Sequence, residues 1–491
     1  MKLATACSEC RLTKRKCAQD PADPDAACFA CQTRGIECSK PWANPKHLTR
    51  WQVPLLHIAP AAQNRGLIAS SEAIKDFVRL YFLYIHDRPH SLFHEPTLWA
   101  ALEDGTLPES LIAAICALGC RFSANIGQRE LTNLFVSRSK SMLGQNLEDM
   151  SIVNIQTCIL LANSYAAEQN NRLEALYFGI ANRMAYVLRL HQTDHTDAPI
   201  LREIKLRVWW SLFMADKWCP PGLGLPREIL KSDPSLDLPM DEVDFQTLHI
   251  TECSSLSERS SGIWAYKTTL ADILASIQDV NLSLVHGHND RQIVDLEVAS
   301  IAARLTAWHE TLPRHMVMND ENFEAHRAEG QGGTFVALHF GYHHYSTLLY
   351  FQYLEPDQEP DEKTSFRLLD RARRSGNCHV VYFTVAHMTI VSSSVLLHML
   401  LFGGNAEVEV ARLQLTRNFE ALEALTRYWP GVEQLKERLF VFQDACLRST
   451  AARAYAVDRW IVRFLLEYAL PIAISQERRA FLGKALEDVR S

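Results

Sequence analysis

Residues 7–38 read CSECRLTKRKCAQDPADPDAACFACQTRGIEC, and this stretch holds six of the thirteen cysteines of the chain. The six form two copies of the spacing C-x2-C-x6-C, joined by ten residues: Cys7, Cys10, Cys17, Cys28, Cys31 and Cys38. A C-x2-C pair places two thiolates on one side of a tight turn that enters a helix, and the third cysteine returns about two turns later. The pattern predicts a metal site.

Each copy supplies three ligands, one fewer than tetrahedral zinc requires. Two zinc ions need about eight bonds, so six cysteines suffice only if two of them bridge both ions. The spacing therefore predicts one shared cluster. Disulfides are the alternative, but this spacing in an intracellular chain favours metal, and residues 1–6 are too short for the apolar segment of a secretory signal.

Basic residues are concentrated in the first copy of the repeat. Its six-residue spacer contains Arg11, Lys14, Arg15 and Lys16, whereas the matching spacer of the second copy contains only Arg34. Six thiolates around two divalent ions leave about two surplus negative charges, which Arg11, Lys14 and Lys16 would offset. Four bases exceed that need, so we expect a phosphate partner. A zinc store or a protein-binding knuckle is the alternative, and the basic run argues against storage.

Residues 7–17 resemble the first half of the fungal zinc binuclear cluster DNA-binding domain, which usually reads C-x2-C-R-x2-K-x-K-C. Every one of these positions matches, including Arg11, Lys14 and Lys16. The resemblance implies two Zn²⁺ ions per chain, bridged by Cys7 and Cys28. It also implies that the first helix enters the major groove of double-stranded DNA over a CGG-like triplet, with Lys14 as the base reader.

Two positions depart from the usual pattern of that domain: Thr13 stands where lysine is common, and Ala26 where many members carry proline. A lysine can donate to guanine O6 and N7, so Lys14 would specify sequence. The other predicted DNA contacts, Arg11, Arg15, Lys16 and Arg34, would hold phosphates. The family resemblance further implies a nuclear regulator of RNA polymerase II promoters that meets the transcription machinery.

The composition is that of a soluble globular protein: 491 residues, 47% apolar and 22% charged. The net charge is −7, yet residues 1–50 hold nine Lys or Arg against five Asp or Glu, so they carry +4 and the remainder −11. Only the N-terminal part suits DNA. We predict a zinc cluster domain over residues 1–40, a linker over 41–71 and an α-helical regulatory domain over 72–491.

The linker contains four prolines and no heptad repeat, so it predicts no coiled coil. Three states stay open: a monomer, a homodimer or heterodimer formed elsewhere, or pairing on DNA. A single triplet is too short to specify a binding site in a genome, so a second half-site, flanking contacts or a partner protein is expected.

Helical periodicity dominates after residue 72, and strand signals are sparse, so the fold class is mainly α. Ser151 is a candidate N-cap before an apolar run. Loops are predicted at 220–222, 330–333 and 355–362. Two stripes with the i, i+3, i+4, i+7 pattern are predicted to be buried: Ile74, Phe77, Val78, Tyr81, Phe82 and Ile85, then Leu173, Leu176, Ile180, Ala181, Met184, Val187 and Leu188.

Residues 75–260 resemble the middle homology region of fungal transcription factors. Four segments carry the resemblance: 91–96, 155–165, 179–191 with Arg189 in place of a glycine, and 207–226. Trp209, Trp210 and Phe213 are predicted to be core anchors. An effector pocket remains possible, but no residue identifies its ligand.

Catalytic motifs are missing from the sequence: it contains no P-loop, no dinucleotide fingerprint and no nucleophile elbow. His339, His343 and His344 could hold zinc but are interpreted as partly buried helix residues. Cys116 and Cys120 are interpreted as buried small side chains. Residues 379–402 lack charge and could span a membrane, yet a buried helix, perhaps broken at its serines, is favoured. We predict no membrane partner and no enzyme; a zinc knuckle protein or zinc enzyme without DNA binding is the alternative.

Overall fold

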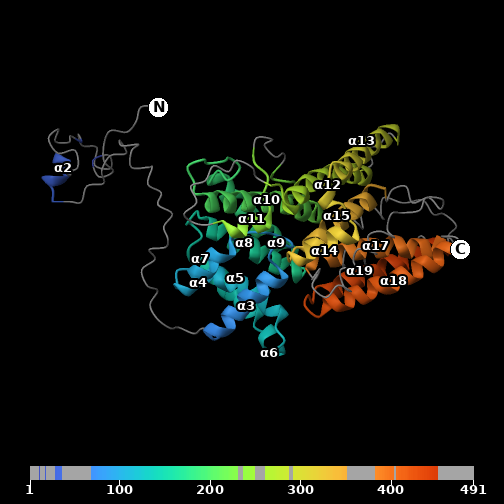
Figure 1. The fold of residues 1–491 in the computed structure, drawn as a ribbon, viewed down its shortest axis with the longest axis horizontal. Coiled ribbons are helices and arrows are strands. Elements are labelled where there is room, and N and C mark those ends of the chain that lie inside the picture. Colours follow the sequence, from blue (N-terminus) through green and yellow to red (C-terminus); the bar gives the residue numbers. More distant parts are fainter. Residues whose placement is uncertain are drawn as a thin grey trace, which may run out of the picture. The chain divides into compact units, whose positions relative to one another are not determined.

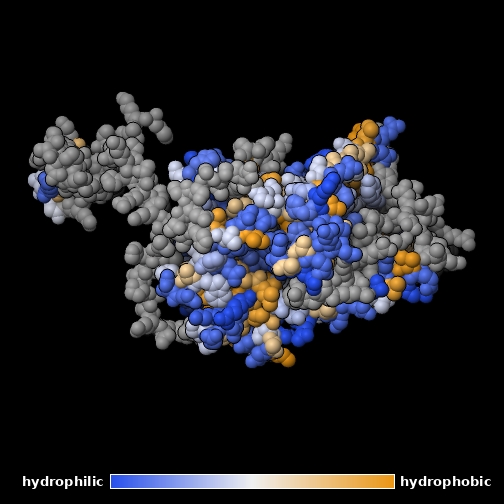
Figure 2. Space-filling view, in the orientation of Figure 1, coloured by the Kyte–Doolittle hydropathy of each residue, from blue (hydrophilic) through white to orange (hydrophobic). Residues whose placement is uncertain are grey.

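The computed structural model describes residues 10, 17, 28–35, 68–229, 236–248, 260–286, 291–350, 382–402 and 405–451. The chain divides into two compact units, Met1–Gln63 and Asn64–Ser491, both drawn as ribbons in Figure 1 and as space-filling surfaces coloured by hydropathy in Figure 2. Each unit is described by itself. The domain limits at residues 40 and 71 remain predictions.

The first unit contains a short helix, α2 (Phe29–Gln32), that begins directly after Cys28. The carbonyl of Cys28 accepts hydrogen bonds from the backbone N–H groups of Cys31 at 2.9 Å and of Gln32 at 3.0 Å. Gly35, at φ +60°, ends the following turn in a left-handed conformation that glycine adopts without strain. The second C-x2-C pair therefore forms the tight turn into a helix that the sequence predicts.

The second unit is helical, and its described residues form no β-strand, which confirms the mainly α fold class. Figure 1 shows α17, α18 and α19 packed side by side, and α8 packed against α9. Its helices are α3 (Ser71–Tyr84), α4 (Glu95–Glu103), α5 (Glu109–Gly119), η2 (Cys120–Phe122), α6 (Ile126–Arg129), α7 (Thr132–Gln145), α8 (Ile152–Ala167), α9 (Asn171–Val187), α10 (Pro199–Leu223), α11 (Glu242–Thr247), α12 (Ile263–His286), α13 (Arg291–Glu310), η3 (Arg314–Met316), α14 (Asp320–Ala328), α15 (Gly332–Tyr350), α17 (Phe383–Phe402), α18 (Asn405–Thr426) and α19 (Val432–Ala451).

Helix α3 buries the apolar stripe that its sequence predicts. Phe77, Val78 and Tyr81 are fully buried, and Ile85 follows them just after the helix. The backbone of α5 comes so close to α3 that a side chain at Gly119 would stand 2.0 Å from the carbonyl oxygen of Phe77. The packing of the two helices therefore requires a glycine at position 119.

Helix α8 begins where predicted, because the Ser151 hydroxyl accepts a hydrogen bond from the backbone N–H of Asn154 at 3.3 Å. The stripe predicted for α9 is wrong at two positions: Leu176 and Val187 are 52% and 57% exposed. Leu176 and Val187 are eleven residues apart, which puts both on one helix face. The core lies against another face, which carries Tyr177, Phe178, Ala181, Met184 and Ala185.

Two predicted loops are partly helical. Helix α10 continues through residues 220–222, where prolines predict a break, and Gly224 at φ +69° follows its last residue. The prolines lie in the last turn of α10. Because little helix follows them, the backbone N–H donors that they lack disturb little of the helix. The predicted loop at 330–333 is only half loop: the connection between α14 and α15 is residues 329–331, and α15 begins at Gly332. The segment 355–362 lies outside the described residues.

The uncharged segment 379–402 supplies α17, whose window Phe383–Leu400 is long and apolar enough to cross a membrane. In the structure 72% of that window is buried inside the protein, as in a core helix. The helix is continuous through its serines, which corrects the expected break. Ser393 and Ser394 donate their hydroxyl protons to the backbone carbonyls of Thr389 and Val391, both at 2.7 Å, so they disturb neither helix nor core.

Candidate metal centre

Three sulfur atoms form the core of the first unit. The Sγ atoms of Cys10, Cys28 and Cys31 all lie within 4.8 Å of one another, and each of these residues is at most 1% exposed. Cys17 is partly buried and packs against this cluster. The C-x2-C turn brings Cys28 and Cys31 together, and Cys10 joins them from the first copy of the repeat.

The distances fit a shared metal ion and exclude a disulfide between the neighbours. The Sγ atoms of Cys10 and Cys28 are 3.6 Å apart, whereas a disulfide needs about 2.05 Å. Two thiolates on one tetrahedral zinc, each at about 2.3 Å, would be about 3.8 Å apart. Cys10, Cys17, Cys28 and Cys31 are all thiols in the structure, so the disulfide alternative is wrong for these four.

The environment of Cys28 favours its ionised form. Burial raises the pKa of the Cys28 thiol, but hydrogen bonds from the backbone and side chain of Cys31 and from Cys10 and Cys17 lower it to about 6. Because thiolates rather than thiols bind zinc, a lowered thiol pKa suits a ligand position. The sulfur set therefore fits zinc in both geometry and acidity.

The structure describes five of the eleven predicted site residues. Cys10, Cys28 and Cys31 come together, Cys17 lies beside them, and Arg34 is exposed in the turn after α2. The other six lie outside the described residues: Cys7, Arg11, Lys14, Arg15, Lys16 and Cys38.

The histidines of α15 do not form a second metal site in the part of the chain that the structure describes, where the three clustered cysteines are the only such group. His339 is buried and donates from Nε2 to the carbonyl of Met316 at 2.9 Å. Burial lowers the pKa of His339 to about 4 and that of His344 to about 3, so both are neutral core histidines. All three histidines lie on α15 as interpreted, with His343 partly buried and His339 and His344 more fully buried than expected.

The second unit contains a buried charge network that the sequence reasoning missed. Arg207 on α10 donates to Glu203 at 2.9 Å, to Ser91 at 2.6 Å and to Glu242. Its guanidinium also lies 4.1 Å from the ring centroid of Phe245. Glu203 is one helical turn before Arg207, a visible signal, but Ser91 and Glu242 are distant in sequence.

The same network organises the segment 91–96. Ser91 donates to Glu242 at 2.8 Å, and Gln246 donates to the carbonyl of Phe93 at 3.0 Å and accepts from the backbone N–H of Glu95 at 2.7 Å. Burial raises the pKa of Glu242, but its pairing with Arg207 and its hydrogen bonds to His86 and Gln246 hold the pKa well below its usual range. The charges at this site are therefore structural.

Two family models match the chain. The fungal Zn(2)-Cys(6) binuclear cluster domain matches residues 5–47, and the fungal specific transcription factor domain matches residues 78–310. Together they cover more than half of the chain. The chain belongs to the fungal zinc binuclear cluster transcription factors. The zinc cluster domain of this family binds two zinc ions through its cysteines.

Curated relatives of this zinc cluster factor agree with the family models. "Uncharacterized transcriptional regulatory protein C530.11c" of Schizosaccharomyces pombe is 22% identical over 422 residues, 72% of this chain and 50% of the relative. "Zn(2)-C6 fungal-type transcription factor FTF1a" of Fusarium oxysporum f. sp. lycopersici is 26% identical over 257 residues, 47% of this chain and 23% of the relative. The chain thus spans half or less of the length of these relatives.

Proposed function

We propose that this zinc cluster factor binds double-stranded DNA in the nucleus and regulates RNA polymerase II promoters by reading CGG-like triplets. The proposal is supported above all by the convergence of Cys10, Cys28 and Cys31, the residues whose spacing predicts the zinc cluster. Four bases lie between Cys10, a member of that cluster, and Cys17, which packs against it, so bound metal would fix both ends of the basic segment.

The roles of the basic residues follow from groove chemistry. Lys14 would donate to guanine edges, while Arg11, Arg15, Lys16 and the exposed Arg34 would bind phosphates. Two thiolates would bridge the two zinc ions, because six otherwise fall short of two tetrahedral sites, and the family resemblance assigns this role to Cys7 and Cys28. The helical unit would act as the regulatory domain of this DNA reader.

Chelation tests the proposal directly. A gel-shift assay with the full chain would compare a CGG-containing duplex with a scrambled duplex, before chelation, after it, and after zinc is restored. We expect preference for the CGG duplex, its loss with chelator and its return with zinc, since the thiolate cluster folds only around metal. Equal binding to both duplexes, or binding that survives chelation, would favour the alternative of a zinc knuckle that serves protein contacts.

A further inference from the structure

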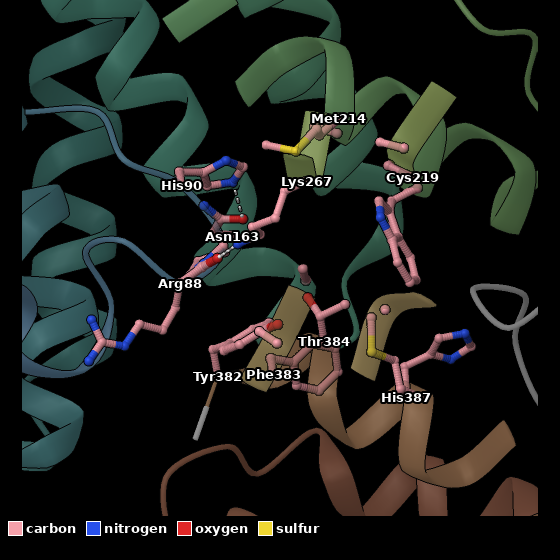
Figure 3. A pocket seen from close by; sticks show the side chains of 18 of the residues that line it. Arg88, His90, Asn163, Met214, Cys219, Lys267, Tyr382, Phe383, Thr384 and His387 are labelled. Carbon is pink, nitrogen blue, oxygen red and sulfur yellow. Dashed lines mark hydrogen bonds between the residues drawn. The ribbon is translucent and has the colours of Figure 1, made fainter. Parts of the chain in front are cut away.

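We propose that the helical unit binds a small organic monocarboxylate with an aromatic or branched aliphatic body in a cavity lined by α8, α9, α10, α12, α15 and α17 (Figure 3). This inference goes beyond DNA recognition and does not depend on it. The cavity lies wholly within the second unit.

The size of the cavity limits the ligand. Its volume is about 150 Å³. An apolar protein cavity of about this volume accommodates benzene, so the site suits a molecule of about six to ten non-hydrogen atoms.

Most of the wall is apolar and held rigid by ring contacts. Phe178, Trp218, Leu270, Tyr345 and Met388 line the cavity. The Trp218 ring lies 5.9 Å from that of Tyr345 and stacks 5.7 Å from that of His344, with an interplanar angle of 7°. A preformed aromatic wall favours a flat or branched apolar body, because little side-chain entropy is lost on binding.

One corner of the lining carries a cation without a carboxylate partner. Lys267 on α12 donates to the carbonyl of Arg88 at 2.6 Å, as Figure 3 shows, and its Nζ lies 4.1 Å from the ring centroid of Trp264. No carboxylate among the described residues forms an ion pair with Lys267. Burial lowers its pKa to about 8, so it remains mostly charged at neutral pH.

The described acidic groups near this corner form no ion pair with Lys267. Asp87 acts on Lys267 at longer range, but burial and the neighbouring Glu242 raise the Asp87 pKa. Asp87 accepts hydrogen bonds from Trp264 and Thr334 instead. Glu174 is the only acidic residue in the lining; burial raises its pKa to about 8, so it is mostly neutral at pH 7. Lys267 therefore lines the cavity without a described carboxylate at ion-pair distance, which leaves its ammonium group available to an anionic ligand.

His90 and Asn163 add hydrogen-bonding capacity at the same corner, as Figure 3 shows. His90 Nε2 donates to Asn163 Oδ1 at 3.2 Å, and burial lowers the His90 pKa to about 4, so the ring is neutral. Asn163 Nδ2 is buried and has no hydrogen-bond partner among the described residues. A carboxylate has two oxygens, and Lys267 and Asn163 offer a donor to each.

Equilibrium dialysis of the full chain at pH 7 tests the site, with radiolabelled phenylacetate as the first probe and benzoate and 4-methylpentanoate as further probes. We expect saturable binding of at least one probe below 1 mM, with one molecule per chain. The uncharged phenylacetamide should compete at least 10-fold more weakly than phenylacetate. Absence of saturable binding for all three acids, or equal competition by the amide, would overturn the proposal.

Two variants locate the binding. Lys267→Met keeps most of the side-chain volume and should weaken phenylacetate binding at least 10-fold, while Lys140→Met, at an exposed position of α7, should leave it unchanged. Gly341→Leu on α15 should fill the cavity, because the first atom of its side chain would meet Leu270 at an ordinary 3.7 Å. Its helix should be at least as stable as with glycine.

Thermal unfolding separates a filled cavity from a misfolded protein. Gly341→Leu should abolish binding at an unchanged or higher Tm. Binding that persists in Gly341→Leu, or that falls equally in Lys267→Met and Lys140→Met, would place the ligand elsewhere. Gel shifts on the same samples report DNA binding separately, so either proposal can fail without the other.

Discussion

Arg189 illustrates how one residue stores strain in the helical unit. It lies just after α9 at φ +57°, in the left-handed region, where a non-glycine residue costs about 1–2 kcal/mol. Its backbone N–H donates to Tyr186, and that of Leu190 donates to Ala185, which is the Schellman ending of a helix. This geometry explains why the resemblance to the family places glycine at this position.

Arg189→Gly should therefore stabilise the protein. The side chain of Arg189 is exposed, so its removal loses little packing while the backbone strain is relieved. We expect a gain of about 0.5–1 kcal/mol in the free energy of unfolding, measured by urea denaturation, after the larger chain entropy of unfolded glycine is subtracted. Arg183→Gly, at an exposed position inside α9, should instead destabilise by about 1 kcal/mol. A loss of stability in Arg189→Gly would contradict this reading of the helix end.

Lys14 and Arg11 should separate specificity from affinity. Lys14→Ala should cost about 1–3 kcal/mol on a CGG duplex and little on scrambled DNA, since it removes a base contact. Arg11→Ala should weaken binding to both and lower the dependence on salt, because a phosphate contact releases a counterion. Fluorescence anisotropy at several salt concentrations measures both effects. Equal losses for Lys14→Ala on the two duplexes would show that it does not read bases.

At the scale of single helices, local sequence predicts where α8 begins and which face α3 buries, but not which face α9 buries. The serine cap of α8 and the stripe of α3 are both read from neighbouring residues. The face of α9 is not, because it depends on tertiary contacts: Tyr177 stacks 5.5 Å from Tyr165 of α8 and Phe178 lies 6.4 Å from His90, measured between ring centroids, whereas Leu176 stays exposed. Likewise, two prolines near the end of α10 predict a break, but the helix continues through them because they lie in its last turn.

The cap of α8 makes a measurable contribution to stability. Ser151→Ala removes the acceptor for the Asn154 N–H and should lower the free energy of unfolding by about 1 kcal/mol. Ser141→Ala, at an exposed position inside α7, should change it by less than about 0.5 kcal/mol. If both variants lose the same amount in denaturant titrations, the hydroxyl of Ser151 is not acting as a cap.

Across the whole molecule, the fold class and the convergence of Cys10, Cys28 and Cys31 could be predicted from the sequence, but the buried charges could not. Cysteine spacing is a local pattern, so the sequence alone shows that Cys28 and Cys31 lie in one turn and can bind the same metal. Lys267, by contrast, is one lysine on a long helix, and only the assembled fold shows that it lines a cavity. The pairing of Arg207 with Glu242 depends in the same way on tertiary structure.

The raised pKa of Glu174 should make stability depend on pH. The carboxyl binds its proton more tightly in the folded protein, with a pKa of about 8 against an ordinary 4.5, so folding favours the protonated form. Stability should fall as pH rises from 6 to 8, by on the order of 2 kcal/mol. Glu174→Gln cannot ionise and should lack this part of the decline in urea titrations at the two pH values. Parallel declines in the variant and the natural protein would refute the assignment.

The most direct test of the account is a zinc titration of the metal-free full chain, followed at once by total zinc per chain and by affinity for a CGG duplex. The account predicts that two zinc ions bind and that specific DNA binding reaches its plateau only as the second site fills. A plateau at one zinc per chain, or full discrimination of the CGG duplex without zinc, would contradict it.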